Sequence, residues 1–345
     1  MVDRNVIIVG SGLSGMSAAY HLTLNGVKDV TVIERMPDWR YAKYHRTCGE
    51  AVSDRLLKMS GVPKDCIVSD VSTVRIRSDE VSIDIPSKGH IIDRERLLAD
   101  LRVSTDAEYV RGSVRAVRKD GDGFIVECDG TEFRCRYLIG ADGVFSVVRR
   151  DIFGYQPKER FATVNNIVDG SGSPDILDFE VSSKYPGAYR WDFPSKPGKR
   201  SIGYVNGTDD IDGCIERGIR YIAVGRNGPV VDGNCCLVGD AAVLTNPICY
   251  AGIGASLLSG RKAAECIAKG DLRPYSKWIE KGKMFDDHIM VAHDTFKAWS
   301  AEELEDAMHP FRKKYSVSRG AYAMMRRPHW ANVYMSIWMS FRRGW

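Results

Sequence analysis

The stretch VIIVGSGLSGMSAAYHLTLNGVKDVTVIE, residues 6–34, decides the fold of this chain. It reads as a buried strand, a glycine-rich turn, a helix of small residues and a second buried strand, which is the pattern of a β-α-β unit in a parallel sheet. The turn holds Gly10, Gly12 and Gly15 in GxGxxG spacing. Gly10 permits the tight turn, Gly12 lets a pyrophosphate approach the backbone, and Gly15 lets the helix pack closely on the strand.

The second strand ends at Glu34, about 20 residues after the last of these glycines, where a carboxylate can accept hydrogen bonds from ribose hydroxyls. The first turn of the helix, with Leu13 and Ser14, presents free N–H groups and a positive dipole end to phosphates. GxGxxG alone is weak evidence. Between a strand and a helix, with an acid at this distance, it predicts a Rossmann-like dinucleotide-binding site, which Arg35 is also expected to line.

Two later segments indicate which dinucleotide is bound. YLIGADG, residues 137–143, and CCLVGDAA, residues 235–242, are apolar strands that end in glycine and aspartate, at the edge where open α/β sheets hold their ligands. A nicotinamide dinucleotide needs no second and third site of this kind, whereas a flavin with its long polyhydroxyl ribityl chain does. The sequence therefore predicts FAD, held in part by Asp142, Gly143, Gly239 and Asp240.

These segments resemble the large FAD-dependent family typified by para-hydroxybenzoate hydroxylase. The resemblance implies that Asp240 binds the ribityl and pyrophosphate region and that Asp142 and Gly143 shape the loop beside it. It also implies that a helix opening after Pro247 and running to about Ala268 directs its N-terminus at the pyrimidine edge of the isoalloxazine. A positive dipole end there stabilises the anionic reduced flavin.

The same resemblance assigns two more cofactor contacts. Arg94, at the start of an expected helix, would contact the cofactor, and the backbone of Val114 would meet the adenine. The alternatives are an ordinary surface arginine and a valine in the core of a strand.

Two further motifs narrow the resemblance to the geranylgeranyl reductase family. RTCGEAVS, residues 46–53, has a basic residue followed by Cys-Gly-Glu, and YPGAYRWDFP, residues 185–194, satisfies P-x-x-Y-x-W-x-F-P. With GxGxxG and GDAA…NP…GI, four motifs agree in order over roughly residues 1–270. The resemblance implies that reduced FAD saturates C=C bonds of isoprenoid chains, often on archaeal ether lipids or on the prenyl chains of quinones and chlorophylls. Its further implied cofactor contacts are Arg46, Cys48, Gly49, Gly252, Ile253 and Gly254.

The aromatic residues of the second motif have a strand's period of two, which puts Tyr189, Trp191 and Phe193 on one face. An isoprenoid offers no hydrogen-bonding group, so its binding must come from buried apolar area, roughly 25 cal/mol per Å², and flat, rigid rings suit it. We predict that these rings line the prenyl channel, the alternative being ordinary packing in a core. Tyr250 is also placed at the substrate, where the family is usually glycine-rich, and this departure leaves the substrate and redox partner open.

The implied chemistry is hydride transfer from flavin N5 to one alkene carbon and a proton to the other. Because such an alkene is a poor hydride acceptor, positioning and exclusion of water must lower much of the barrier. The catalytic candidates are Cys48 and Glu50. Cys48 is a proton donor, a group that positions the ring, or a packing residue. Arg46 and Glu50 would set its local field, or Glu50 is a solvated loop carboxylate, so the proton donor stays open.

The expected fold is α/β, with a Rossmann-like FAD-binding domain, a discontinuous antiparallel-sheet substrate domain and a C-terminal helical segment. Because the sequence has one GxGxxG, electrons are expected from a ferredoxin, a quinol-like donor or transiently docked NAD(P)H. The expected ranges are 1–66, 90–155 and 230–270 for the first domain, 67–89 and 156–229 for the second, and 271–345 for the helices.

Composition limits the class of protein. The 345 residues contain no run of about 18 apolar residues, and the strand pattern begins without a basic-then-apolar leader, which argues against secretion. The nine cysteines show no metal-ligand spacing, so no metal is expected, a reducing cytoplasm is the natural compartment, and Cys235 and Cys236 are expected to be buried thiols. Because residues 310–345 carry the positive charge behind the net +4, no nucleic-acid partner is expected.

The last segment has an aromatic stripe flanked by arginines. Trp330, Tyr334, Trp338, Phe341 and Trp345 recur every three or four residues, so they share one face of a helix. This composition suits a helix at a membrane interface, and it also suits a helix that packs on the body of the protein. Both interpretations remain open.

Two other functions remain as alternatives. A flavin monooxygenase or halogenase on the same scaffold would act on an apolar or aromatic substrate and would need oxygen, although the halogenase stretch W-x-W-x-I-P does not occur in the sequence. A flavoprotein that carries electrons or a lipid without transforming it is the third.

Overall fold

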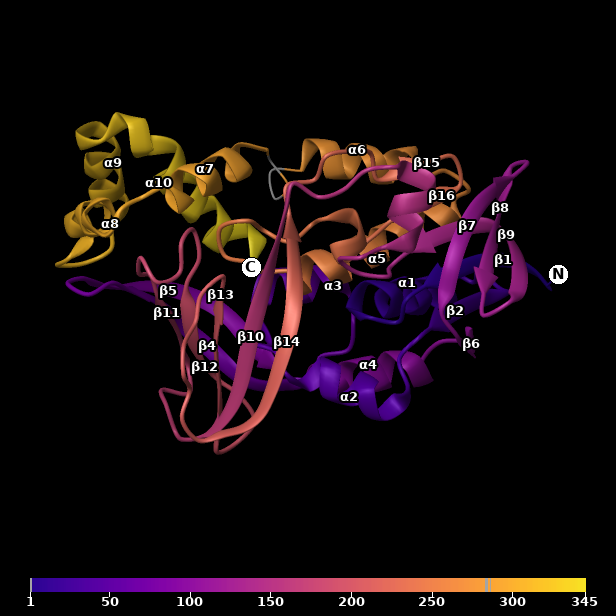
Figure 1. The fold of residues 1–345 in the computed structure, drawn as a ribbon, viewed down its shortest axis with the longest axis horizontal. Helices are drawn as coiled ribbons and strands as arrows, with labels where there is room; N and C mark the ends of the chain where they lie inside the picture. Colours follow the sequence, from indigo (N-terminus) through magenta and orange to yellow (C-terminus); the bar gives the residue numbers. More distant parts are fainter. Residues whose placement is uncertain (1, 283–284, 286) are drawn as a thin grey trace.

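The computed structural model describes residues 2–282, 285 and 287–345. Its strands form two eight-stranded sheets, which lie at opposite ends of the molecule in Figure 1. Helices α1 and α5 lie beside the first sheet, and the C-terminal helices α7 to α10 lie over the second (Figure 1). The predicted α/β class with a Rossmann-like domain, a second sheet and a helical end is confirmed.

The first sheet has the strand order β15-β16-β9-β1-β2-β6, and β7 and β8 extend it through the pairing of β8 with β9. β1 runs parallel to both β9 and β2, with Val6 opposite Tyr137 and Val30. Because β16 is also parallel to β9, the C-terminal ends of these strands meet at one edge, where ligands of such sheets bind. The strands are β1 Val2–Val9, β2 Val30–Glu34, β6 Glu108–Arg111, β7 Val114–Asp120, β8 Gly123–Cys128, β9 Thr131–Gly140, β15 Val231–Asp232 and β16 Cys235–Leu237.

The helix after the glycine-rich turn, α1 (Leu13–Leu24), is capped by Asn25, and Gly26 follows with a φ of 72°, the left-handed conformation that favours glycine after a helix. It packs against α5 (Ile253–Ala268). A Cβ on Gly260 would lie 2.2 Å from the carbonyl oxygen of Ser14, so only glycine lets the two helices approach this closely. The other helices of this half are α2 Asp38–Arg46, α3 Asp54–Ser60 and α4 Arg94–Val103.

The second sheet has the order β14-β10-β13-β12-β11-β4-β5-β3 and is antiparallel except between β11 and β4. Ala51 of β3 pairs with Ile91 of β5, so the sheet includes residues on both sides of the 67–89 range expected for it. The strands are β3 Ala51–Ser53, β4 Ile67–Arg77, β5 Ser82–Ile92, β10 Glu159–Asp169, β11 Ile176–Glu180, β12 Arg190–Pro194, β13 Lys199–Val205 and β14 Cys214–Val224.

Two large apolar clusters form the core, one against each sheet. In the first, Cys235 and Cys236 are fully buried, as predicted. Burial raises the pKa of both thiols, so they stay protonated and unreactive.

The C-terminal helices pack on the second cluster. Trp330 and Trp345 are buried, and Tyr334 and Phe341 are partly buried against the same cluster, so most of the aromatic stripe contacts the body. Among the described residues, no helix combines the length and apolar character needed to cross a bilayer. The helices are α6 Arg273–Lys281, α7 Asp287–Lys297, α8 Ala301–Met308, α9 Val317–Arg326 and α10 Ala331–Met339.

Candidate functional site

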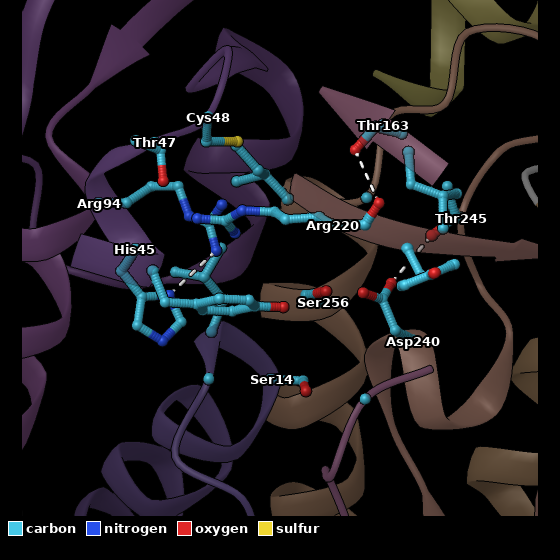
Figure 2. Close-up of a pocket in the computed structure, with 18 of the residues that line it drawn as sticks. Ser14, His45, Thr47, Cys48, Arg94, Thr163, Arg220, Asp240, Thr245 and Ser256 are labelled. Atoms are coloured by element: carbon cyan, nitrogen blue, oxygen red, sulfur yellow. Dashed lines mark hydrogen bonds between the residues drawn. The ribbon is translucent and has the colours of Figure 1, made fainter. Parts of the chain in front are cut away.

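A cavity of about 580 Å³ lies between the C-terminal edge of the first sheet and the second sheet. Its wall comes from segments far apart in the sequence, several of which are labelled in Figure 2. Of the residues predicted from the sequence, those that line it are Gly10, Gly12, Leu13, Ser14, Glu34, Arg35, Cys48, Gly49, Glu50, Arg94, Val114, Asp142, Gly143, Tyr189, Trp191, Phe193, Asp240, Tyr250, Gly252 and Ile253.

The glycine-rich loop is shaped by close backbone packing. A Cβ on Gly10, which has a φ of 99°, would lie 2.5 Å from the carbonyl oxygen of Ala141. A Cβ on Gly15 would lie 2.0 Å from the carbonyl oxygen of Gly10. At Gly12, by contrast, an added Cβ would have the ring of His45 as its nearest neighbour, 4.0 Å away. Gly10 and Gly15 are therefore packed against protein backbone, whereas the surface at Gly12 is open to the cavity.

Glu34 stands at the end of β2 and binds this loop. One carboxylate oxygen accepts hydrogen bonds from the backbone N–H and the hydroxyl of Ser11 at 3.0 and 2.7 Å, and the other accepts one from the N–H of Met36 at 2.8 Å. The carboxylate is thereby held at the rim of the cavity.

Asp142 and Asp240 follow β9 and β16, as the parallel topology requires. Oδ2 of Asp142 accepts hydrogen bonds from the N–H groups of Val147 and Val148 at 2.6 and 3.3 Å, and its Oδ1 has no hydrogen-bond partner among the described residues. Asp240 accepts one from the hydroxyl of Thr245 at 2.9 Å (Figure 2). Burial raises the pKa of both carboxyls, because it disfavours their charged form. A hydroxyl that donates a hydrogen bond to either carboxylate stabilises that charged form.

The helix expected after Pro247 begins later, at Ile253, and the prediction of its start is wrong. The side chain of Asn246 accepts hydrogen bonds from the N–H groups of Ile248 and Cys249 at 2.8 and 3.1 Å, which folds the segment into a turn. Tyr250, with a φ of 46°, continues this turn. The N-terminus of α5 that faces the cavity belongs to Gly252 and Ile253, without a side-chain cap.

Five predicted cofactor contacts do not line the cavity. The Arg46 guanidinium is drawn away by an ion pair with Glu216 at 2.9 Å, and Pro247 lies within the turn just described. The other three are glycines that allow close packing. A Cβ added at Gly15 would lie 2.0 Å from Gly10, one at Gly239 would lie 2.7 Å from Ser14, and one at Gly254 would lie 2.4 Å from Leu56.

Cys48 lies with two cationic side chains, the buried Arg94 of α4 and the partly buried Arg220 of β14. Figure 2 shows both guanidinium groups below the cysteine. Burial opposes ionisation of the thiol, but the two guanidinium charges outweigh it, so the pKa of Cys48 is lowered. Burial likewise holds the pKa of His45 well below its ordinary value, and the neutral ring contacts Nη2 of Arg94 through Nδ1 at 3.2 Å.

Glu50 is buried, unlike the solvated carboxylate that was one alternative. It has a φ of 53°, and its Oε1 accepts a hydrogen bond from the N–H of Arg94 at 3.0 Å. Burial, with the neighbouring Cys48, raises its pKa to about 8. Glu50 therefore holds a proton at neutral pH.

The aromatic rings of β12 and of Tyr189, which directly precedes this strand, form one wall. Tyr189, Trp191 and Phe193 are 7 to 8% exposed, and the ring of Phe179 lies 4.8 Å from Tyr189 and 5.0 Å from Phe193. The indole N–H of Trp191 donates to Asn165 at 3.2 Å. The rings are therefore fixed in a packed sheet while their cluster lines the cavity.

Several lining residues were missed. Arg220 alternates with exposed residues in β14 and reads as part of a solvent face, although its Nε and Nη2 have no hydrogen-bond partner in the described part of the chain. Phe341 and Trp345 line the cavity from the C-terminal segment. Only the stripe pattern signalled them, and it did not indicate which surface they meet.

Three comparisons with known proteins bear on this site. The family model of the NAD(P)-binding Rossmann-like domain matches residues 8–40. A digeranylgeranylglycerophospholipid reductase of Methanopyrus kandleri is 27% identical, over 88% of this chain and 89% of that protein.

Solved structures share the fold. A geranylgeranyl bacteriochlorophyll reductase-like protein from Thermoplasma acidophilum superposes with a TM-score of 0.78 at 21% identity, covering 95% of this chain and 97% of that one. HpxO of Klebsiella pneumoniae, in complex with FAD and uric acid, gives a TM-score of 0.67 at 16% identity, with 97% of both chains covered. The predicted resemblance is thus confirmed: this chain is similar along most of its length to digeranylgeranylglycerophospholipid reductases, and its fold is that of FAD-containing flavoproteins.

Proposed function

We propose that this chain is a FAD-dependent reductase that saturates C=C bonds in the isoprenoid chains of ether lipids. The observation that carries the proposal is the shared cavity, because the glycine-rich loop and the three aromatic rings of residues 189–193 line the same space. The similarity to digeranylgeranylglycerophospholipid reductases over 88% of the chain supports the substrate class.

The described residues fit FAD. The open surface above Gly12 and the uncapped N–H groups of α1 suit a pyrophosphate, and Glu34 and Arg35 at the rim suit the adenosine ribose. The unpaired Oδ1 of Asp142 and the carboxyl of Asp240 suit ribityl hydroxyls. The remaining contacts in this proposal are Leu13, Ser14, Gly49, Val114, Gly143, Gly252 and Ile253.

When bound, reduced FAD supplies a hydride. Tyr189, Trp191 and Phe193 would hold the alkene by apolar contact and exclude water. Positioning and exclusion of water are the two effects that lower the barrier of such a reaction. Cys48 and Glu50 are our candidates for the groups nearest the reaction. The protonated Glu50 can keep a proton in the site at neutral pH, and the arginines beside Cys48 stabilise negative charge there.

We further infer that electrons come from a separate donor, a ferredoxin or docked NAD(P)H. The chain would meet its lipid at a membrane surface. Within the described C-terminal region, α9 supports this contact, because Val317, Tyr322 and Met325 are 75, 49 and 75% exposed. The aromatic stripe is less suited, since Trp330 and Trp345 are buried.

The proposal is tested with the full chain loaded with FAD, reduced by dithionite without oxygen and mixed with digeranylgeranylglyceryl phosphate in detergent. Mass spectrometry should find product heavier by pairs of hydrogens. Trp191→Leu should raise KM about tenfold, because roughly 50 Å² or more of apolar contact is lost at about 25 cal/mol per Å². Trp278→Leu, in α6 outside the cavity lining, is the matched control.

Three results would point elsewhere. No mass gain with any of several prenyl lipids rejects the reductase. Rapid oxygen consumption stimulated by an aromatic compound would favour the monooxygenase or halogenase. A lipid that is bound and released unchanged by the reduced protein would favour a carrier.

A further inference from the structure

Tyr250, the residue that departs from the family pattern, connects the cavity to a buried histidine. It lines the cavity, and its ring lies 5.9 Å from that of Tyr189. Its φ of 46° is unusual for a bulky residue, and such strain persists only where the surroundings hold it. Its hydroxyl lies 3.0 Å from the carbonyl oxygen of Gly187 and 3.0 Å from Nε2 of His293 in α7.

These two contacts share one phenolic hydrogen, so they allow two arrangements. If Tyr250 donates to Gly187, its oxygen must accept the Nε2–H of His293. If Tyr250 donates to His293, that histidine carries its hydrogen on Nδ1 instead. When one proton enters at Nδ1 and one leaves from the Tyr250 hydroxyl, the first arrangement becomes the second without movement of a heavy atom.

The far side of His293 faces a charged cluster. The side chain is 0% exposed, and its Nδ1 makes no hydrogen bond within the described residues. Asp294 lies 3.7 Å from Nδ1, and donor atoms of Glu159, His293 and Asp294 all lie within 4.8 Å of one another. The carboxylates are 42% exposed at Asp294 and 21% at Glu159, so the cluster reaches solvent.

A metal ion is a poor occupant of this cluster. Lys158 pairs with Asp294 at 2.6 Å, and Lys297 pairs with Glu159, so two cations already neutralise the two carboxylates. The ring of Phe161, 5.7 Å from that of His293, brings no charge. Nδ1 of His293 is the atom left without a hydrogen-bond partner among the described residues, and it can accept a proton from the surface side.

We propose that Tyr250, His293 and the Glu159–Asp294 pair form a proton relay that supplies the cavity during alkene reduction. The inference rests on the proposed function. Reduced FAD, when bound, would supply the hydride for one C–H bond, and the Tyr250 hydroxyl would give its proton to the other alkene carbon. Nε2–H of His293 reprotonates the phenolate, and Nδ1 takes a proton from water at the partly exposed Glu159–Asp294 pair, which balances the addition of two hydrogens.

Burial explains why a relay is needed at this tyrosine. It raises the pKa of Tyr250 far above the ordinary value, so a phenolate cannot persist and must be reprotonated as it forms. Burial also lowers the pKa of His293, although Glu159 and Asp294 oppose this. The ring is therefore neutral near pH 7, which is the form that can donate from one nitrogen and accept at the other.

The catalytic test uses FAD-loaded, dithionite-reduced protein with the digeranylgeranyl lipid in H₂O and D₂O. Tyr250→Phe and His293→Gln should lower the single-turnover rate about 10²-fold, the usual contribution of a general acid, with KM within threefold and FAD retained. The solvent isotope effect should also change, because another proton source takes over. Tyr185→Phe, a buried tyrosine outside the cavity lining, should change none of these. Unchanged rates and isotope effects in both variants would overturn the relay while the reductase stands.

A second measurement needs no substrate. In protein labelled with ¹⁵N-histidine, which has seven histidines, His293 is assigned from the signal lost in His293→Gln. Wild-type His293 should show ring nitrogen shifts averaged between two tautomers, and Tyr250→Phe should shift it to one. A single tautomer that is the same in both proteins would overturn the relay whether or not prenyl lipids are reduced. Failure of the wild type to reduce any lipid, with averaged shifts present, would instead reject the proposed function.

Discussion

Tyr189 donates a hydrogen bond from its hydroxyl to the backbone carbonyl of Cys249 at 2.5 Å, which ties the aromatic wall to the turn before α5. Tyr250 of that turn reaches back to the carbonyl of Gly187, beside the same wall. The two tyrosines therefore cross-link segments 187–189 and 249–250 in both directions. Because Tyr189 donates to Cys249 and the Tyr250 hydroxyl lies within hydrogen-bond distance of Gly187, the wall and the turn are positioned as one unit.

Tyr189→Phe should destabilise the protein by about 1–3 kcal/mol, because it leaves the buried carbonyl of Cys249 without its donor. The expected result is a melting temperature lower by a few degrees, read by calorimetry. Tyr20→Phe, at a partly buried tyrosine of α1 outside the cavity lining, is the control. Equal melting temperatures in the two variants would mean that the Tyr189 bond contributes no stability.

Glu50→Gln should remove a pH dependence of stability. The folded pKa of Glu50, about 8, lies above its ordinary value of 4.5, so between these values the folded state holds a proton that the unfolded state has released. Stability from this group is therefore full below about pH 4.5 and is lost as pH rises through 8, with a limiting slope of about 1.4 kcal/mol per pH unit. Glutamine keeps the neutral form and can still accept from Arg94.

The advantage of Glu50→Gln over wild type should accordingly grow from pH 5 to pH 8.5 in denaturant titrations. Glu95→Gln, at a partly exposed position of α4, should show no such trend. A constant difference across this range would mean that Glu50 is ionised in the folded protein.

Cys48 should be the most readily alkylated cysteine at pH 6.5–7. Its pKa is lowered by Arg94 and Arg220 against the effect of burial, and the thiolate is the reactive form. Labelling with iodoacetamide, followed by peptide mass spectrometry, should modify Cys48 before the exposed Cys214. Arg220→Met should slow the labelling of Cys48 several-fold and leave that of Cys214 unchanged. Faster labelling of Cys214 in the wild type would contradict the electrostatic account.

The parts of the site that could be predicted depend on local constraints. Gly10 and Gly15 are required by contacts within a few residues or with the adjoining strand, so their spacing alone indicated the loop. Asp142 and Asp240 follow from the parallel strand topology. The turn at Asn246 was missed because its residues are apolar and one asparagine side chain redirects the backbone.

Other residues carry no local signal. Arg220 enters the cavity because β14 pairs with β10, with Arg220 opposite Thr163, which lies 57 residues earlier in the chain. His293 reaches Tyr250 only because α7 packs against the second sheet's apolar cluster. Such placements follow from tertiary packing, which periodicity does not encode.

Membrane binding through α9 should depend on an apolar face with basic neighbours. Val317, Tyr322 and Met325 are exposed on this helix, and Lys313 and Arg326 are exposed beside them. Burying such a face in lipid recovers apolar area, while the cations meet anionic headgroups, so binding should weaken with salt. Vesicles of 70% phosphatidylcholine and 30% phosphatidylserine provide the surface in a sedimentation assay.

The double variant Val317→Glu and Met325→Glu should leave most of the protein in the supernatant, since it removes apolar area and adds charges that anionic lipid repels. Val103→Glu changes an 84% exposed valine on α4 and should sediment as wild type does. FAD absorbance and the melting temperature report whether either change disturbs the fold. If the double variant and wild type partition equally, α9 does not bind lipid, and the exposed face must have another role or none.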